Sequence, residues 1–538
     1  MSIYTDVFLC ICTRKLSNHY GSLWRSLTYQ ATSTTACVSS LLLLSSSKPS
    51  LALAGILAPS CLRDHGSCRS SATCTTFCVG SPTIRCATSL CATGRLCCSG
   101  SASVRSWSSP PPTADAAREV FTGHGTAFDH HPSSPGIEEI LKDGMGVLFA
   151  PYGEQWRQLR RILVTELLSV RRVAEFRRIR EDEAARLASS LFSSSGRLVN
   201  VDERLAVFVA DSSVRAIFSD RIPNRAALLR LFKRGTEPST VFSIRDLFPT
   251  SRLVGMLPRS HKREQYRQDL FRHIDDILQH HEERRQMAGD KKDGEQDMIS
   301  VLLRIQKEDA ARVNLTPGVL RALLSDVLFA ATDTSTSTLQ WAMAELIANP
   351  RVMEKIQLEI RGVLAGQERV CEAALSSMPY LKAVVKETLR LHPPGPFIPR
   401  SCLEDQKVQG YDVPKGTILV VNAWTISRDP TYWEDPENFM PERFEGDHAL
   451  DFKGLDFEFT PFGAGRRICP GITFAQANVE IALATLLYHF DWELPHGVKP
   501  EELDMTEQFG ITVSRKSQLL LSPIPRIPFD CTPRPHSS

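Results

Sequence analysis

A ten-residue stretch near the carboxyl end of the chain, residues 462–471, contains the residue types of a metal-binding thiolate site. Cys469 follows two glycines, Arg467 lies two residues before it, and an apolar helical pattern covers 472–487. A cysteine beside a helix N-terminus is biased towards the thiolate, because free N–H groups and the helix dipole favour negative charge. The glycines allow close approach of a flat partner, and arginine pairs well with a carboxylate. The set therefore fits a haem whose iron is bound by Cys469 and whose propionate pairs with Arg467.

A glycine-rich turn around Cys469 also has a simpler interpretation. Free cysteines are often small buried hydrophobic side chains with no chemical role. A Gly-x-Arg-x-Cys pattern alone does not separate the two interpretations, whereas the full ten-residue stretch is far more specific. The elements that would position a cofactor against this cysteine are therefore the next test.

A long helix is predicted over residues 317–348. Thr316 provides an N-cap, Pro317 suits the first helical position, and Asn349 precedes a proline that ends the pattern. At about 1.5 Å per residue this helix would span roughly 48 Å, enough to cross a domain. Its middle, 332–338, is a run of Thr, Ser and Asp, whose side chains compete for backbone hydrogen bonds. Such a local violation between apolar neighbours favours a functional site over a solvated patch.

Other predicted elements carry charged or aromatic side chains at helical spacing. Trp156 and Arg160 lie four residues apart and therefore share a helix face. Glu387 and Arg390 share a face of a helix predicted over 378–391, a spacing that is usually only a surface salt bridge.

Short strands are predicted between and after these helices. Residues 410–417 are typical of a hairpin turn that leads into a strand over 418–421. A second short pair is expected around 509–513 and 518–521. The body of the chain is therefore predicted to be mainly α with small β-sheets.

The composition of residues 1–113 differs from that of 114–538. The first segment holds eleven of the fifteen cysteines and nine Lys plus Arg against two acidic residues, without helical or strand periodicity. The second has the composition of a globular domain and few cysteines, as in a reducing compartment. A disulfide or zinc module would need Cys-x-x-Cys pairs, and an organelle transit peptide would be shorter. We favour an aberrant Ser/Cys-rich segment, disordered or mispredicted through a wrong reading frame or exon choice.

The charge and hydropathy of the chain limit its partners. The net charge is +2 without a long basic run, so no nucleic-acid partner is indicated. The two apolar runs near the start, 41–44 and 51–58, are shorter than the ~20 residues that a membrane-spanning helix needs.

Four motifs stand in one order along the chain. They are Trp156…Arg160; Ala330-Ala331-Thr332-Asp333-Thr334-Ser335; Glu387-Thr388-Leu389-Arg390 with Pro441-Glu442-Arg443-Phe444; and the stretch around Cys469. This order resembles that of the cytochrome P450 superfamily over about residues 114–525. The residue pattern of 392–396, 410–417 and 509–512 is similar to the plant microsomal class that oxidises specialised metabolites. Most of these motifs are weak alone, but the four together are specific.

The resemblance implies a cofactor and the residues that hold it. Cys469 matches the axial thiolate ligand of the iron of haem b, and Phe462 matches an aromatic side chain near the sulfur. The residues that match those holding the haem propionates are Arg467, Trp156, Arg160 and Arg400.

The resemblance also implies catalytic and structural polar groups. Asp333 and Thr334 match an acid–alcohol pair beside bound oxygen, and such a pair can relay protons through water into a largely dry pocket. The buried charge triad that shapes the cysteine side of the fold is matched by Glu387, Arg390 and Arg443.

The chain departs from the family pattern at two places. Ala331 stands where the family usually has glycine, so its methyl group would narrow the groove near the oxygen site. The membrane anchor, the Pro-rich hinge and the β-rich part expected before Ala114 are not recognisable. Their loss would remove packing surface and put folding and haem retention in question.

The implied function is a haem-thiolate monooxygenase that uses O2 to hydroxylate or epoxidise a small hydrophobic plant metabolite of terpenoid, phenylpropanoid or indole type. An NADPH-dependent flavoprotein reductase would supply the electrons at the cytosolic face of the endoplasmic reticulum membrane; a plastid location is less favoured. The implied substrate-facing segments are 130–146, 322–330, 395–399 and 508–512. The side chains that would make this pocket apolar are Phe397, Ile398, Phe509 and Ile511.

Two other functions stay open. One is a haem-thiolate isomerase or dehydratase that acts on peroxides without a reductase. Such an enzyme needs no proton relay, so Asp333 and Thr334 argue against it. The other is an inactive product of a damaged or wrongly predicted gene.

Overall fold

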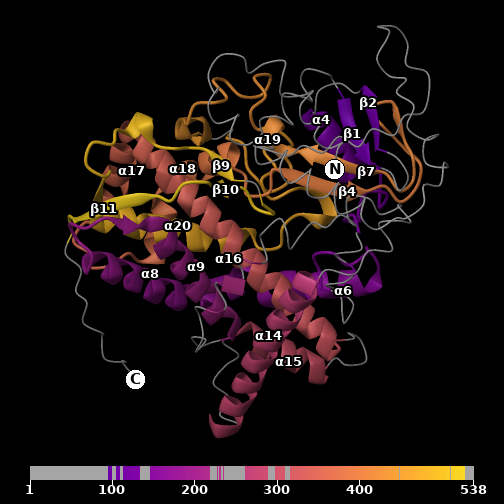
Figure 1. The fold of residues 1–538 in the computed structure, drawn as a ribbon, viewed down its shortest axis with the longest axis horizontal. Coiled ribbons are helices and arrows are strands. Elements are labelled where there is room, and N and C mark those ends of the chain that lie inside the picture. Colours follow the sequence, from indigo (N-terminus) through magenta and orange to yellow (C-terminus); the bar gives the residue numbers. More distant parts are fainter. Residues whose placement is uncertain are drawn as a thin grey trace, which may run out of the picture. The chain divides into compact units, whose positions relative to one another are not determined.

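A computed structural model describes residues 95–99, 104–108, 113–133, 146–218, 261–288, 297–308, 315–446, 449–508 and 510–527, with a few single residues between these ranges. The chain divides into two compact units, 1–72 and 73–538, and all described residues belong to the second. This part is mostly helical with small antiparallel sheets, which confirms the predicted fold class (Figure 1). None of its described helices has the length and apolar character needed to cross a membrane.

The described helical segments include long helices and several single turns. They are α4 (Ala114–Arg118), η1 (Glu119–Gly123), α6 (Glu154–Ile162), η2 (Leu163–Leu167), α7 (Val170–Glu175), α8 (Arg177–Phe192), α9 (Val201–Phe218), α14 (His261–Ala288), α15 (Met298–Glu308), α16 (Pro317–Ala348), α17 (Pro350–Val363), η3 (Glu372–Ser377), α18 (Pro379–Leu391), α19 (Ala423–Ile426), η4 (Pro441–Phe444), η5 (Gly465–Arg467), α20 (Ile472–His489) and η6 (Pro500–Glu502). The described strands are β1 (Arg95–Ser99), β2 (Val104–Ser108), β3 (Val199–Asn200), β4 (Phe397–Ser401), β5 (Gln406–Val408), β6 (Tyr411–Val413), β7 (Ile418–Asn422), β8 (Phe490–Glu493), β9 (Glu507–Gln508), β10 (Ser514–Arg515) and β11 (Leu520–Pro525).

Helix α16 has the bounds that the sequence predicted, and it packs against α9, α18 and α20 (Figure 1). The Thr316 hydroxyl caps it by accepting the N–H of Val319 at 3.3 Å. Its buried apolar side chains up to Leu328 belong to one hydrophobic cluster, and those from Leu339 onward belong to another. The polar run 332–338 therefore lies where two parts of the core meet.

The largest described sheet has the strand order β2-β1-β7-β4. Strands β1 and β2 lie within residues 1–113, where the sequence analysis found no strand periodicity and expected the β-rich part to be missing. The structure differs for this short piece, because β1 pairs antiparallel with β7 more than 300 residues later, as in the pair Cys98 and Leu419. A partner so distant in sequence leaves no local pattern to recognise.

The strand predicted over 418–421 is confirmed as part of β7, which pairs with β4 along its length. The hairpin turn before it lies earlier in the sequence than predicted. It joins β5 and β6 at Gln409 and Gly410, both of which have a positive φ. The predicted pairing of 509–513 with 518–521 is wrong. Strand β9 pairs with β10, whereas β11 pairs with β8 and with β3, which lies about 320 residues earlier.

The three residues predicted as a charge triad meet at one buried point. The carboxylate of Glu387 accepts two bonds from Arg390, at 2.7 and 2.8 Å, and one from Arg443 at 3.1 Å. Arg390 also donates to the carbonyls of Ser427 and Pro436, and so joins α18 to the segment before η4. Glu387 and Arg390 are fully buried, so each depends on the other for charge compensation.

We predict that Arg390→Met lowers the free energy of unfolding by about 3–5 kcal/mol, because it leaves the Glu387 carboxylate short of a cation in a buried place. The urea midpoint followed by circular dichroism measures this change. Lys407→Met is the control, since Lys407 pairs with Asp412 in an exposed position and should barely move the midpoint. Equal midpoints for the two variants would contradict the structural role of the triad.

Candidate cofactor site

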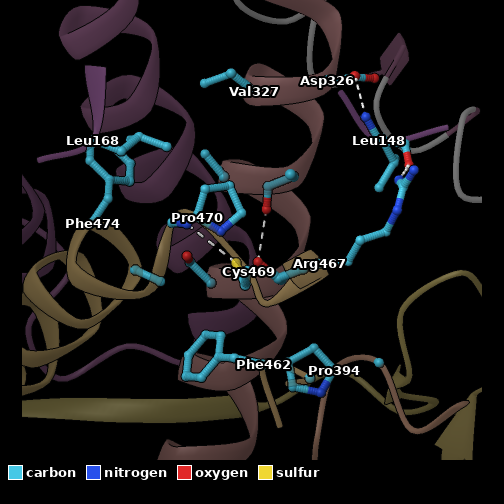
Figure 2. Close-up of a pocket in the computed structure, with 18 of the residues that line it drawn as sticks. Leu148, Leu168, Asp326, Val327, Pro394, Phe462, Arg467, Cys469, Pro470 and Phe474 are labelled. Carbon is cyan, nitrogen blue, oxygen red and sulfur yellow. Dashed lines mark hydrogen bonds between the residues drawn. The ribbon is translucent and has the colours of Figure 1, made fainter. Parts of the chain in front are cut away.

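The predicted site residues surround one cavity of about 380 Å³. Its walls come from α6, α16, the start of α20, residues 394–400 and residues 461–471 (Figure 2). Seven of the eight predicted cofactor and catalytic residues line it, namely Trp156, Arg160, Thr334, Arg400, Phe462, Arg467 and Cys469. The eighth, Asp333, is not part of its wall.

Cys469 is held in the cavity wall by backbone bonds on both sides of the sulfur. Its N–H donates to the carbonyl of Phe462 at 3.0 Å, and the N–H of Gly471 points at Sγ from 3.4 Å. Helix α20 begins one residue later, at Ile472. Burial raises the pKa of the Cys469 thiol, while the Gly471 N–H and the charge of Arg160 oppose that rise. A thiolate there gains most from a bound metal cation, which also replaces the proton.

The turn before Cys469 requires glycine at Gly465. Its φ is +71°, and a Cβ atom there would lie 2.3 Å from the carbonyl oxygen of Phe121. The backbone of this turn therefore packs directly against η1, and it keeps Arg467 and Cys469 pointing into the cavity (Figure 2). Glycine serves here to bring two backbone segments together.

Three guanidinium groups line the cavity, and they donate hydrogen bonds to backbone carbonyls. Arg467 donates to the carbonyls of Leu148 and Ala150 at 3.3 and 2.6 Å. Arg400 donates to Pro399 and Arg160 to Ile468. No ion pair with a carboxylate within 4.0 Å joins any of the three among the described residues.

This cluster carries positive charge that the described residues do not neutralise by direct pairing. Burial, reinforced by Arg467, lowers the pKa of Arg400 to about 10, and burial also lowers the pKa of Arg467 to about 10, while the Asp129 carboxylate partly opposes both shifts. Both remain protonated at neutral pH, so the cavity favours an anionic ligand. A flat cofactor with carboxylates at one edge and a metal facing Cys469 fits this donor set, and haem has both.

Trp156 supports the same edge of the cavity. Its indole Nε1–H donates to the carbonyl of Val147 at 3.1 Å, and the guanidinium of Arg467 lies 4.7 Å from the ring centre. Arg160 lies one turn further along α6, which agrees with the predicted shared helix face. Helix α6 thus presents one aromatic and one cationic side chain to the cavity.

His131 is a cavity residue that the sequence analysis placed only within a broad substrate-facing range. Burial lowers its pKa to about 3, with further lowering by Arg400 and Arg467. It is therefore a neutral imidazole at physiological pH, next to two cations. No signal in the sequence separates it from its neighbour His130.

The cavity face of α16 carries hydroxyl groups. Thr334, Ser335 and Thr338 line the cavity, and the two threonines donate to carbonyls four residues earlier, at 2.8 and 3.0 Å. These bonds satisfy the two hydroxyls within the helix, so the polar run leaves neither of them unpaired. The Ser335 hydroxyl is buried without a partner among the described groups.

Asp333 does not line the cavity although it adjoins Thr334 in sequence. Burial raises the pKa of its carboxyl, partly opposed by a hydrogen bond with Thr512. Its Oδ2 atom is buried and has no hydrogen-bond partner among the described residues. The structure thus places the predicted acid and alcohol in different surroundings on adjacent positions of α16.

Much of the remaining wall is apolar, as the sequence analysis expected for a hydrophobic ligand. Val327, Ala330, Phe397 and Ile398 line the cavity from the predicted substrate-facing segments. Ala331 also lines it, in the position where the sequence departs from the family pattern. Ile511, which was predicted to face the pocket, does not line it and is 45 % exposed near the β9–β10 turn. Phe509 lies outside the described residues.

Asp326 is a cavity residue that the sequence analysis placed only within the substrate-facing segment 322–330, without a role of its own. Its Oδ2 atom accepts the N–H of Leu148 at 2.9 Å (Figure 2). Burial raises the pKa of Asp326 to about 6, partly opposed by the N–H groups of Leu148 and Val147. A single acidic residue in the apolar stretch 322–331 was the signal that could have indicated it.

Comparison with known proteins points to one family. The family model described as Cytochrome P450 matches residues 112–521. Desmethyl-deoxy-podophyllotoxin synthase of Sinopodophyllum hexandrum is 42% identical over 410 residues, covering 76% of this chain and 80% of that protein. Cytochrome P450 71D95 of Mentha spicata is 44% identical over 409 residues, covering 76% and 82%. Premnaspirodiene oxygenase of Hyoscyamus muticus is 40% identical over 422 residues, covering 77% and 83%.

Solved structures show the same fold. A zebra fish cytochrome P450 with progesterone superposes with a TM-score of 0.70 at 21% identity, covering 82% of this chain and 99% of that one. The zebra fish structure with abiraterone gives a TM-score of 0.68 at 22% identity, covering 83% and 99%.

We predict that Gly465→Ala lowers the amount of haem bound per chain, because the added methyl displaces the turn from the Phe121 carbonyl. Gly497→Ala is a matched control, since Gly497 also has a positive φ but no atom lies within 4 Å of the place where its methyl group would stand. Each variant should lose about 1 kcal/mol from backbone strain, and only Gly465→Ala should lose haem. Haem per chain is read from the absorbance ratio of Soret to protein bands. Equal haem content in both variants would contradict the proposed close packing.

Proposed function

The chain belongs to the cytochrome P450 family of haem-thiolate monooxygenases, and we propose that it hydroxylates or epoxidises a small hydrophobic plant metabolite. The observation that carries the proposal is the cavity itself, in which Cys469, three guanidinium groups and a hydroxyl-bearing helix face surround an otherwise largely apolar space. One oxygen atom of O2 enters the substrate and the other leaves as water, with two electrons and two protons consumed.

The proposed substrate class rests on the cavity wall and on the relatives. Phe397, Ile398, Val327 and Ala330 offer an apolar surface that fits a terpenoid, phenylpropanoid or indole-type skeleton. The relatives include a premnaspirodiene oxygenase and a desmethyl-deoxy-podophyllotoxin synthase. We therefore expect a substrate with a largely apolar skeleton, because its apolar surface would be removed from water against this wall.

In the proposed site the protein would hold the haem at two places, the iron and the propionates. Cys469 would bind the iron, Phe462 would pack near the sulfur, and the propionates would pair with Trp156, Arg160, Arg400 and Arg467. When bound, the haem supplies the activation of O2. The chain supplies a fixed thiolate, a neutralising cationic edge and a cavity that excludes bulk water.

Proton delivery is proposed for Asp333 and Thr334. The raised pKa of the Asp333 carboxyl favours a group that takes up and releases a proton more readily near neutral pH than an exposed carboxylate. The Thr334 hydroxyl faces the cavity and could pass a proton after leaving the Ala330 carbonyl. The two residues would act in sequence, from the buried carboxyl to the cavity.

The electrons are proposed to come from an NADPH-dependent flavoprotein reductase, because family members generally rely on a redox partner. The proposed location is the cytosolic face of the endoplasmic reticulum membrane, from the resemblance to the plant microsomal class. Turnover should therefore be measured with the protein and this reductase reconstituted together in lipid vesicles.

We predict that Cys469→Ala abolishes the thiolate-type Soret band of the reduced, carbon monoxide-bound protein. Cys402→Ala is the matched control, because Cys402 is also a free cysteine but is buried outside the cavity wall. Its spectrum should keep the band. Survival of the band in Cys469→Ala would refute the ligand assignment, and its absence from the unchanged chain would favour an inactive product.

We predict that Thr334→Ala and Asp333→Asn lower product formation about tenfold or more and raise hydrogen peroxide per NADPH, because protons reach bound oxygen less efficiently. Thr336→Ala is the control, since its hydroxyl makes the same bond to the carbonyl four residues earlier but does not line the cavity. Product and peroxide are measured with the reductase and a panel of apolar metabolites. Turnover without reductase would contradict the monooxygenase and favour an isomerase or dehydratase.

A further inference from the structure

A short irregular segment, which we call the strap and define as residues 146–150, lies between α16 and the cationic edge of the cavity. Its carbonyl groups face that edge: Val147 accepts from the Trp156 indole, and Leu148 and Ala150 accept from Arg467. The strap therefore fixes the direction of two side chains that would hold the cofactor. Figure 2 shows Asp326, Leu148 and Arg467 connected in series at one side of the cavity.

The N–H groups of the same strap are held by one carboxylate. Asp326 Oδ2 accepts the Leu148 N–H at 2.9 Å, and the Asp326 carboxyl also bonds the N–H of Val147. Asp326 belongs to α16, which is fixed in both parts of the hydrophobic core. A helix that packs into two hydrophobic clusters thus holds the strap through a single side chain.

The contact is close enough to exclude a side chain on the strap. A Cβ atom on Gly146 would lie 2.1 Å from Asp326 Oδ2 and 3.0 Å from the carbonyl oxygen of Ala322. A side chain at residue 146 would therefore have to displace the Asp326 carboxylate, whereas the backbone angle of this glycine is not in the left-handed range. The carboxylate and the strap are fitted to each other.

We infer that Asp326 is a positioning residue for the cofactor, and that its carboxylate holds the strap so that the strap carbonyls orient Arg467 and Trp156 towards the propionates. The inference rests on the haem site proposed above. It assigns Asp326 no contact with the reacting atoms, and it explains why an acidic side chain occupies a largely apolar stretch of α16.

The ionisation of Asp326 agrees with this role. With its pKa raised to about 6, the group is mostly a carboxylate at neutral pH, and a carboxylate accepts hydrogen bonds without donating any. Two N–H donors are the partners that such a group requires when it is removed from water. An alanine in its place would leave both strap N–H groups without their acceptor.

The test is the rate at which the holoenzyme loses haem to excess apomyoglobin. Asp326→Ala should accelerate haem loss about tenfold, since two hydrogen bonds that orient the strap are removed. Asp202→Ala is the matched control: Asp202 accepts a backbone N–H from Leu519 at 2.8 Å, and burial raises its pKa too, but it does not line the cavity. This control should lose haem at the unchanged rate.

A double-mutant cycle with Arg467→Met tests whether Asp326 acts through the strap. If it does, Asp326→Ala should add little to the haem loss caused by Arg467→Met, because the strap then has no guanidinium to orient. Additive effects, or haem loss from Asp326→Ala at the unchanged rate, would overturn the inference. Asp326→Asn retains one acceptor oxygen and should be intermediate, so it serves as the readout should Asp326→Ala not fold.

Failure of this inference is distinguishable from failure of the proposed function. If the unchanged chain binds haem with a thiolate-type spectrum and Asp326→Ala retains it equally well, only the role of Asp326 is wrong. A chain that never shows that spectrum overturns the proposed haem site, and the inference falls with it.

Discussion

Positive charge gathered around one cavity by one buried and two partly buried arginine side chains is the constraint on which the rest of the site depends. Arg160, Arg400 and Arg467 sit in a place that lowers their pKa values, and no carboxylate pairs directly with them among the described residues. Removing charge from water without a direct ion pair is costly, so such a cluster is stabilised by backbone carbonyls around it, by the nearby Asp129 carboxylate and by an anionic ligand against it. The fold provides the carbonyls and Asp129, and the cofactor would provide the anionic ligand. Ligand binding and folding stability are therefore linked in this protein.

Helix α16 forms part of the cavity wall and packs into two hydrophobic clusters of the core. Its apolar residues pack into different clusters on either side of the polar run, and several residues of the run, such as Ser337, are buried between them. Thr334 and Thr338 satisfy their hydroxyls within the helix, and α16 is continuous through a run where intrinsic propensity is low. A rigid helix with a polar centre can face a cavity without an unsatisfied backbone group.

The sequence predicted best what local chemistry determines. The bounds of α16 follow from a cap and two prolines, and the turn at Cys469 follows from contiguous residues, so both were recognisable without the structure. The pairing of β11 with β3 and the pairing of β1 with β7 were not, because each depends on residues hundreds of positions away. Asp326 was given no role for the same reason. Its importance lies in backbone groups about 180 residues earlier, and no motif records them.

Two aspartates on α16, seven residues apart, have the same side chain but different hydrogen-bond partners, and these partners suit them to different roles. Burial raises the pKa of both Asp326 and Asp333. The Asp326 carboxyl bonds two backbone N–H groups, so a proton added there would disrupt the strap that it holds. Asp333 keeps one oxygen without a partner among the described residues, so it can take up a proton without losing a contact. The first arrangement suits a fixed support, and the second suits a group that exchanges protons.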